Sequence, residues 1–374
     1  MSRLFTLASA LLMGACAVLP AGFSPACAED TPAVSNVIGV SQEQFIQSLI
    51  SQDGFDEAWL RAVFASVHER LEIIDILERP STSRPWYVFR PGFVNPVRIR
   101  AGVLFWREHA DLIEAISRHY HVDPEYMVTI LGVETMWGKQ AGRYRVMDVL
   151  TTLAFNYPRR ADFFRKELRE FLLLAREERR DPLSFLGSYA GAMGAPQFMP
   201  SSVRAYAQSW GTDNWRNVWD NTADILASVA NYLAVHGWQQ GAPVVIPAKV
   251  DGDGWKTLAE DKFNLHYRVS DLAKFNVVPD APLQGDPQAV LAPLEREPGT
   301  FDYWLGLNNF YVITRYNRST LYAKAVQELA VAIRAAWEDP NLLPPEPAGK
   351  HTGKSAAKGK PVKHTPAKRR VAHR

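Results

Sequence analysis

Apolar residues recur at helical spacing along most of the chain. Within residues 41–79, stretches such as "FDEAWLRAVFASVHERL" place apolar side chains three and four positions apart, with charged residues between them. Asp123–Pro124 predicts the start of a further helix, with the Asp123 side chain as its cap, and this helix should end near Gly138. Similar spacing recurs in Arg160–Glu178, Thr222–Gly237 and Thr320–Glu338.

Two stretches interrupt this pattern. Ser81–Phe93 is broken by prolines and predicts an extended loop, after which helical spacing resumes at about Arg98. Between roughly residues 240 and 300, short β-branched runs separated by Gly, Pro and Asp predict strands. The expected fold class is therefore mainly α (α+β), with an N-terminal helical part, a helical core and a small β-containing insert.

The first 28 residues are typical of an export signal. Arg3 is followed by a long apolar stretch, and Ala26–Ala28 offers small residues at a cleavage site. Two alternatives stay open: the apolar stretch is long enough to remain as an anchor, and Met13–Cys16 loosely resembles a lipoprotein cleavage box. We expect an exported, periplasmic protein that is soluble after cleavage rather than anchored by a lipid or a helix.

Cysteine use and charge restrict the chemistry of the exported chain. The full sequence has two cysteines, Cys16 and Cys27, and both precede the predicted cleavage site. The exported chain is therefore expected to have no disulfide, thiol nucleophile or thiolate metal site. Lys350–Arg374 carries nine Lys and Arg and no acidic residue, whereas the whole chain has a net charge of +2. The remainder is thus at −7, which leaves an acidic body with a basic tail that we expect to be disordered.

Glu134 stands out because it is a carboxylate inside the apolar helical run "LGVETMWG". On a helix, Ile130 and Trp137 would share its face, and apolar neighbours raise a carboxylate's pKa. A protonated carboxylic acid near neutral pH is what cleavage of a glycosidic bond needs. The alternative is a structural Glu134, bonded to a helix end or to an arginine.

Several long motifs occur in a fixed order and together resemble one known family. They are "LGVETMWG", "FNYPRRA", "GSYAGAMGAPQFMPSS", "SVANYLAVHGW" and "NNFYVITRYNRSTLYA". Over about residues 40 to 335 the chain closely resembles the MltB family of lytic murein transglycosylases. The resemblance implies a lysozyme-like helical core, and cleavage of peptidoglycan between N-acetylmuramic acid (MurNAc) and N-acetylglucosamine (GlcNAc) that leaves a 1,6-anhydro-MurNAc end.

The resemblance also implies roles for particular residues. Glu134 matches the family's catalytic acid and base. Ser188 and Gln197 match residues that hydrogen-bond the sugar and Glu134, although turn chemistry would also explain them. The remaining substrate-binding matches are Arg159 and Arg160, otherwise typical of a solvated turn, and Tyr316, Asn317 and Tyr322, otherwise typical of a core edge.

No cofactor is expected, and calcium binding is not favoured. Many relatives carry an EF-hand-like loop at the position of Ser209–Asp220. Here Asp213, Asn217 and Asp220 stand at loop positions 5, 9 and 12, but Ser209 replaces the opening Asp. The glycine usual at position 6 of such loops is replaced by Asn214, and Gly211 at position 3 offers no side chain.

The expected chain organisation follows from these patterns. The ranges are a signal peptide, 1–28; an N-terminal helical region and loop, 29–97; a lysozyme-like core, 98–238; a β-containing subdomain, 239–300; a C-terminal helical part, 301–340; and a basic tail, 341–374. The expected partner is the peptidoglycan glycan strand, bound by a monomer. The tail is either an inert solubilising end or a tether to anionic envelope polymers or other wall enzymes, and nucleic acid is not expected. A lysozyme-type hydrolase and an inactive murein-binding scaffold remain alternative functions.

Overall fold

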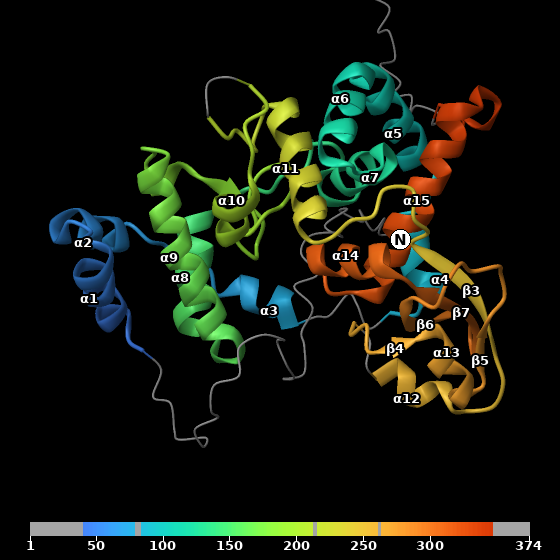
Figure 1. Ribbon diagram of the computed structural model, residues 1–374. Coiled ribbons are helices and arrows are strands. Elements are labelled where there is room, and N and C mark those ends of the chain that lie inside the picture. Colours follow the sequence, from blue (N-terminus) through green and yellow to red (C-terminus); the bar gives the residue numbers. More distant parts are fainter. Residues whose placement is uncertain (1–39, 79–83, 212–214, 261–262, 347–374) are drawn as a thin grey trace, which may run out of the picture.

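The computed structural model describes residues 40–78, 84–211, 215–260 and 263–346 (Figure 1). The predicted signal peptide, and the predicted basic tail from residue 347 on, lie outside the described residues. Helices dominate, so the predicted mainly α fold with a small β part is confirmed. The helices are α1 (Gln42–Asp53), α2 (Glu57–Ala65), α3 (Glu72–Glu78), α4 (Trp86–Phe89), α5 (Pro96–Glu108), α6 (Ala110–Tyr120), α7 (Pro124–Thr135), α8 (Val146–Asn156), α9 (Ala161–Glu177), α10 (Pro200–Tyr206), α11 (Thr222–Val235), α12 (Trp255–Glu260), α13 (Val269–Leu272), α14 (Asn308–Tyr316) and α15 (Thr320–Glu338).

Helix α7 is the central helix of the core. Every residue from Pro124 to Thr135 except Glu125 is buried, because α5, α11 and α15 pack around it. The predicted start at Asp123 is correct, but the predicted side-chain cap is wrong. The Asp123 carboxylate instead accepts hydrogen bonds from Trp238 Nε1 at 2.9 Å and from the Gly241 backbone at 3.0 Å.

The chain turns sharply at the end of α7. Met136, Trp137 and Gly138 all have positive φ, so Trp137 leaves the helix and its indole folds back. The indole Nε1 donates to the Val128 carbonyl at 2.9 Å. The ring covers Gly132, which lies two residues before Glu134 and therefore on nearly the opposite side of the helix. The expectation that Trp137 shares the face of Glu134 is thus wrong.

The β part is an antiparallel sheet in the strand order β4-β6-β7-β3-β5. Its own apolar core is separate from the main helical core. The predicted end of this subdomain at residue 300 coincides with the start of β7, so the sheet extends six residues further. The strands are β3 (Val245–Val250), β4 (Tyr267–Arg268), β5 (Val277–Pro279), β6 (Gln288–Glu297) and β7 (Thr300–Gly306); a separate pair joins β1 (Tyr144–Arg145) to β2 (Leu186–Gly187).

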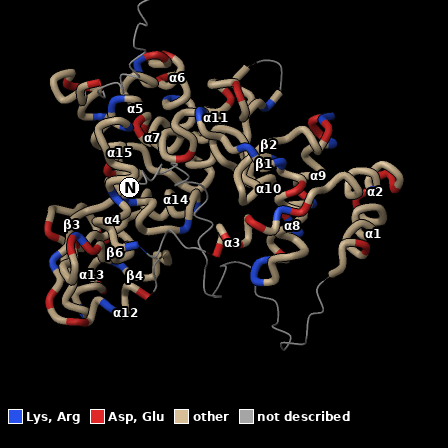
Figure 2. The backbone as a smooth tube through the Cα atoms, turned by 180° about the vertical axis from the view of Figure 1, so that it is seen from behind, with Lys and Arg blue, Asp and Glu red and all other residues tan. Residues whose placement is uncertain are grey.

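Residues before α5 contact two distant parts of the molecule (Figures 1 and 2). At one end, Asp53, the last residue of α1, accepts a 2.8 Å hydrogen bond from Arg169 of α9. At the other, α4 packs against β6, and Arg90 pairs with Glu328 of α15 at 2.6 Å. The prediction of an extended loop over Ser81–Phe93 is wrong for residues 86–92, because these residues form α4 and a short 3-10 turn.

Buried Lys324 joins the sheet to the helices. Its side chain is 2% exposed, and its ammonium lies 4.0 Å from the ring centroid of Trp304 in β7 and 2.7 Å from the Glu328 carboxylate. A buried ammonium is tolerated only with such partners. None of the helices in the described ranges is long and apolar enough to span a membrane.

The packing of Trp137 on α7 gives a stability prediction. A β-carbon at Gly132 would lie 2.4 Å from the Trp137 ring, so Gly132→Ala forces the indole out of place and should lower the free energy of unfolding by about 1–3 kcal/mol. Chemical denaturation measures this change. The matched control is Gly92→Ala, whose β-carbon meets no atom within 4 Å and which should stay within about 0.5 kcal/mol of the wild type. Equal stability of the two variants would contradict this packing.

Candidate active site

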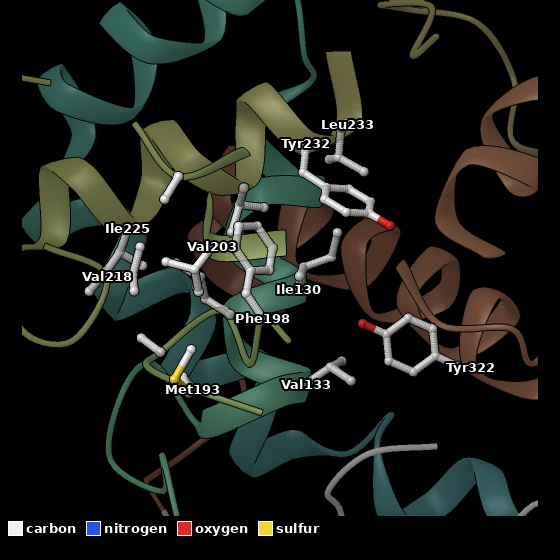
Figure 3. Packing of buried hydrophobic residues seen from close by; sticks show 14 of the residues in the cluster. Ile130, Val133, Met193, Phe198, Val203, Val218, Ile225, Tyr232, Leu233 and Tyr322 are labelled. Atoms are coloured by element: carbon white, nitrogen blue, oxygen red, sulfur yellow. The ribbon is translucent and has the colours of Figure 1, made fainter. Parts of the chain in front are cut away.

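Glu134 lies in the last turn of α7 and is 8% exposed. The hydroxyl of Tyr322 donates a 2.6 Å hydrogen bond to Glu134 Oε1. Tyr322 belongs to the first turn of α15, where its backbone N–H is capped by Ser319 Oγ at 3.2 Å. Figure 3 shows the Tyr322 hydroxyl pointing toward the helix that carries Ile130 and Val133. Two helices far apart in sequence therefore meet at one carboxyl group.

Burial controls the protonation of Glu134. Removal from water raises the pKa of Glu134 from 4.5 to about 7, whereas the Tyr322 hydrogen bond and the positive charge of Arg98 lower it by less. Both the acid and the carboxylate are therefore populated near neutral pH. Within the described part of the chain, no second carboxylate influences the pKa of Glu134.

Arg98 is the residue near Glu134 that sequence reasoning missed. It is 7% exposed, and its guanidinium donates hydrogen bonds to the carbonyls of Gly132 and Gly92. Burial lowers the pKa of Arg98, and the Glu134 carboxylate acts in the opposite direction. Helical spacing gives the signal that could have found it: Arg98, Gly102 and Trp106 recur every four residues and are all buried, so one charge stands on an otherwise apolar face.

Tyr316 is close enough to Glu134 for the two groups to interact electrostatically. Burial raises the pKa of Tyr316 well above its usual value, and the Glu134 charge adds to this effect. The Tyr316 hydroxyl donates to the Pro196 carbonyl at 2.5 Å, and its ring packs edge-on against Tyr232 with centroids 4.8 Å apart. Asn317 follows at the end of α14, where its side-chain Oδ1 is buried with no hydrogen-bond partner among the described residues.

The loop between β2 and α10 carries Ser188 and Gln197. Ser188 is 1% exposed, and its hydroxyl accepts a hydrogen bond from the Ala192 backbone at 3.1 Å. Gln197 has a φ of 53°, and its amide nitrogen donates to the carbonyls of Ala141 and Gly194 at 3.1 and 2.9 Å. Neither residue hydrogen-bonds Glu134, but Gln197 Oε1 is buried without a partner among the described residues.

This loop is fixed to the helices next to Glu134. Thr135 Oγ1 donates to the Ala195 carbonyl at 2.9 Å and accepts from the Gly138 backbone at 2.9 Å. The Pro196 carbonyl is bound by Tyr316 on the other side. The loop that carries Ser188 and Gln197 is therefore held between α7 and α14, as Figure 3 illustrates with Met193 and Phe198 in the core.

Arg159 and Arg160 occupy a short 3-10 turn between α8 and α9. Arg159 is exposed, whereas the guanidinium of Arg160 lies 4.1 Å from the ring centroid of Phe163. No contact joins either arginine to Glu134. The structure thus does not bring this pair to the carboxyl group, and their assignment to the substrate stays a prediction.

In the described part of the loop Ser209–Asp220, protein groups occupy the polar side chains. Asp224 of α11, 1% exposed, accepts hydrogen bonds from the backbones of Trp210 and Asn217, each at 2.9 Å. The Asn217 side chain donates to the Asp220 carboxylate. Asp213 lies outside the described residues. In the described ranges, no group of three or more His, Cys, Asp or Glu side chains is placed to hold a metal.

Comparison with known proteins identifies the family. The family described as "Transglycosylase SLT domain" matches residues 41–331. The chain belongs to this family. It is 40% identical over 304 residues to the membrane-bound lytic murein transglycosylase B of Escherichia coli (strain K12), an alignment that covers 79% of this chain and 82% of that protein.

Solved structures of other transglycosylases have the same fold. The soluble lytic transglycosylase SltB1 from Pseudomonas aeruginosa is 44% identical, with a TM-score of 0.71 over 78% of this chain and 98% of that one. SltB3 from the same organism, in complex with NAG-NAM-pentapeptide, is 29% identical, with a TM-score of 0.66 over 79% and 80% of the two chains. The predicted lysozyme-like core is therefore confirmed.

The raised pKa of Glu134 predicts how stability depends on pH. Below pH 4.5 the side chain is neutral in both states. Between pH 4.5 and about 7 the unfolded chain loses this proton while the folded chain keeps it, so the free energy of unfolding falls as pH rises. Glu134→Gln carries no such proton and should gain stability over the wild type by a few kcal/mol more at pH 8 than at pH 5.

Denaturant unfolding of both proteins at the two pH values measures this difference. The same variant-minus-wild-type difference at pH 5 and pH 8 would contradict the raised pKa. Glu167→Gln can be measured in the same way for comparison. Burial raises the pKa of Glu167 as well, but the backbone and the hydroxyl of Ser201 donate hydrogen bonds to its carboxylate and oppose this rise.

Proposed function

We propose that this protein is a lytic transglycosylase that cleaves the β-1,4 bond between MurNAc and GlcNAc in peptidoglycan and leaves a 1,6-anhydro-MurNAc end. The observation that carries the proposal is a single buried carboxyl group, Glu134, with a pKa of about 7 and no second carboxylate acting on it within the described residues. Retaining and inverting glycoside hydrolases use two carboxyl groups. One carboxyl group suffices when the nucleophile belongs to the substrate.

In the proposed reaction Glu134 acts twice, first as an acid and then as a base. Neutral Glu134 donates its proton to the glycosidic oxygen, the C1–O bond breaks, and GlcNAc leaves with a new hydroxyl group. The resulting carboxylate then accepts the proton of the MurNAc C6 hydroxyl while O6 bonds to C1. No water is consumed, and Glu134 ends in its starting form. A pKa near neutrality suits both steps, because general acid–base catalysis is most effective when the pKa lies near the working pH.

The groups around Glu134 have distinct proposed roles. Tyr322 holds the carboxyl group through its 2.6 Å hydrogen bond and stabilises the carboxylate formed in the first step. Arg98 adds positive charge from a buried position. The substrate's own acetamido group stabilises the positive charge that develops at C1. These three contributions would replace the second carboxylate of a hydrolase.

The other proposed substrate contacts come from three segments. Gln197 and Asn317 each offer a buried side-chain oxygen that lacks a partner among the described residues, so a sugar hydroxyl or amide can supply the missing donor. Tyr316 offers an aromatic face. Ser188 supports the loop through its Ala192 hydrogen bond and binds sugar only if the loop adjusts. Arg159 and Arg160 would meet the peptide part of the substrate.

We further propose that the protein acts in the periplasm as a soluble monomer after removal of residues 1–28. The N-terminal signal pattern supports export, and the similar SltB1 from P. aeruginosa is described as soluble. The E. coli relative is described as membrane-bound, so retention by an anchor is the alternative. The basic tail, Lys350–Arg374, would hold the enzyme near anionic envelope polymers. No metal or other cofactor takes part in the proposed reaction.

Product analysis tests the proposed reaction. The wild-type protein should convert purified peptidoglycan to fragments with 1,6-anhydro ends, which mass spectrometry separates from water-added ends by the mass of one water molecule. Glu134→Gln should lower turnover by roughly 10²–10⁴-fold while leaving the fold intact. Water-added products would instead indicate a hydrolase, and more than a tenth of wild-type turnover in Glu134→Gln would rule out this residue as the acid.

Calcium should have no effect on this protein. Asn217 and Asp220 bind each other, and Ser209 stands where such loops need an acidic ligand. Activity should survive a chelator, and millimolar calcium should leave the melting temperature unchanged, because a ligand that binds the folded state must stabilise it. A calcium-dependent rise in melting temperature that is lost in Asp220→Asn would contradict this prediction.

A further inference from the structure

A pocket of about 450 Å³ lies between α2 and the C-terminal end of α9. It is lined by Gly54, Phe55, Asp56, Trp59, Ala175, Arg176, Arg179, Arg180, Asp181 and Pro182. In both Figure 1 and Figure 2, α2 lies at the opposite end of the molecule from α7 and α15, with α8 and α9 between them. The pocket is therefore separate from the site around Glu134.

The floor of the pocket is aromatic. The ring of Trp59 stacks on that of Phe55 with centroids 5.9 Å apart and planes within 6° of parallel. Phe55 is 5% exposed, whereas Trp59 is 40% exposed, so much of the large indole surface faces solvent. Arg176 lies over Phe55 with its Cζ 4.3 Å from the ring centroid and donates to the Asp53 carbonyl at 2.8 Å. The indole is thus supported from below and held in a fixed orientation.

The rim of the pocket carries three arginines and two carboxylates, which gives it a net charge of +1, and one of these arginines has no ion-pair partner among the described residues. The two lining carboxylates already serve as helix caps: Asp56 accepts from the Trp59 backbone at 2.7 Å, and Asp181 accepts from the Leu183 backbone at 2.9 Å. The guanidinium of Arg180 lies over the Phe185 ring at 4.1 Å. Arg179 is exposed and forms no ion pair with a described residue.

The backbone at Arg179 also favours a binding role. Arg179 follows the cap residue of α9 with a φ of 50°, and the chain then closes with a 3.0 Å hydrogen bond from the Arg180 backbone to the Ala175 carbonyl. Glycine or asparagine usually occupies this left-handed position. A long cationic side chain there carries a backbone cost of roughly 1 kcal/mol. Its attraction to the end of the helix dipole offsets that cost only in part, because such exposed contacts are weak.

We propose that this pocket binds a second stretch of the peptidoglycan strand away from the cleavage site, through a sugar ring on Trp59 and a carboxylate of the stem peptide on Arg179. The flat exposed indole suits the apolar face of a pyranose ring, and a guanidinium pairs with carboxylates. The inference rests on the proposed function. A second contact with the same polymer raises the effective concentration of glycosidic bonds at the active site. The pocket would therefore hold the enzyme on the wall between cleavage events.

Retention on insoluble murein tests the pocket. In a Glu134→Gln background, which slows digestion, Trp59→Ala and Arg179→Gly should each weaken binding to purified sacculi by about tenfold. Arg179→Gly relieves the backbone cost, so its melting temperature should be equal to or above that of the parent. Trp59→Phe and Arg179→Lys should retain most of the binding. The matched charge control is Arg296→Ala, an arginine 58% exposed in the sheet, which should bind as the parent does.

Catalysis provides the second arm of the experiment. In chains with intact Glu134, both pocket variants should turn over short soluble fragments at the wild-type rate, since such fragments do not reach the pocket. Equal retention of all variants, or equal losses in Arg296→Ala, would overturn the proposal. An equal loss of binding to dextran sulfate would show a general anion site and would overturn it too. A failure of the proposed function is distinguished by product analysis, because the wild-type protein would then release no fragments with 1,6-anhydro ends.

Discussion

The burial of one carboxyl group determines the chemistry of this protein. Glu134 sits in a helix that is buried along nearly its whole length, and loss of water around it raises its pKa to about 7. The Tyr322 hydroxyl and the Arg98 guanidinium limit this rise without forming a full ion pair. A direct salt bridge would have lowered the pKa and removed the proton that glycosidic cleavage needs. The site therefore depends on keeping positive charge near Glu134 but not bonded to it.

The fold holds that arrangement from several sides. Trp137 folds back over Gly132 and fixes the end of α7, while Ser319 caps the helix that presents Tyr322. Arg98 is bound to backbone carbonyls, one of them that of Gly132, rather than to the carboxylate. At the far side of α15, Lys324 ties the helix to Trp304 of the sheet. A small shift of α15 would thus move Tyr322 and change the pKa of Glu134.

Local patterns in the sequence predicted much of this. Helical spacing located most of the core helices, and the family motifs pointed to Glu134 and Tyr322. Two kinds of feature were beyond such patterns. The indole of Trp137 leaves the helix because of backbone turns with positive φ, which spacing cannot show. The side chain of Asp123 bonds Trp238 rather than its own helix, because a tertiary partner replaced the local cap. Arg98 could have been found from its position on an apolar face.

The pKa of Glu134 is the quantity that tests this account most directly. Carbon NMR of protein labelled at the glutamate side-chain carboxyl carbon can follow its titration, with Glu134→Gln identifying the signal by its disappearance. The account predicts a midpoint near pH 7, and a higher midpoint in Tyr322→Phe, because the hydroxyl that stabilises the carboxylate is lost. A midpoint near the ordinary 4.5 would contradict it, since Glu134 would then be ionised at neutral pH and could not act as the acid.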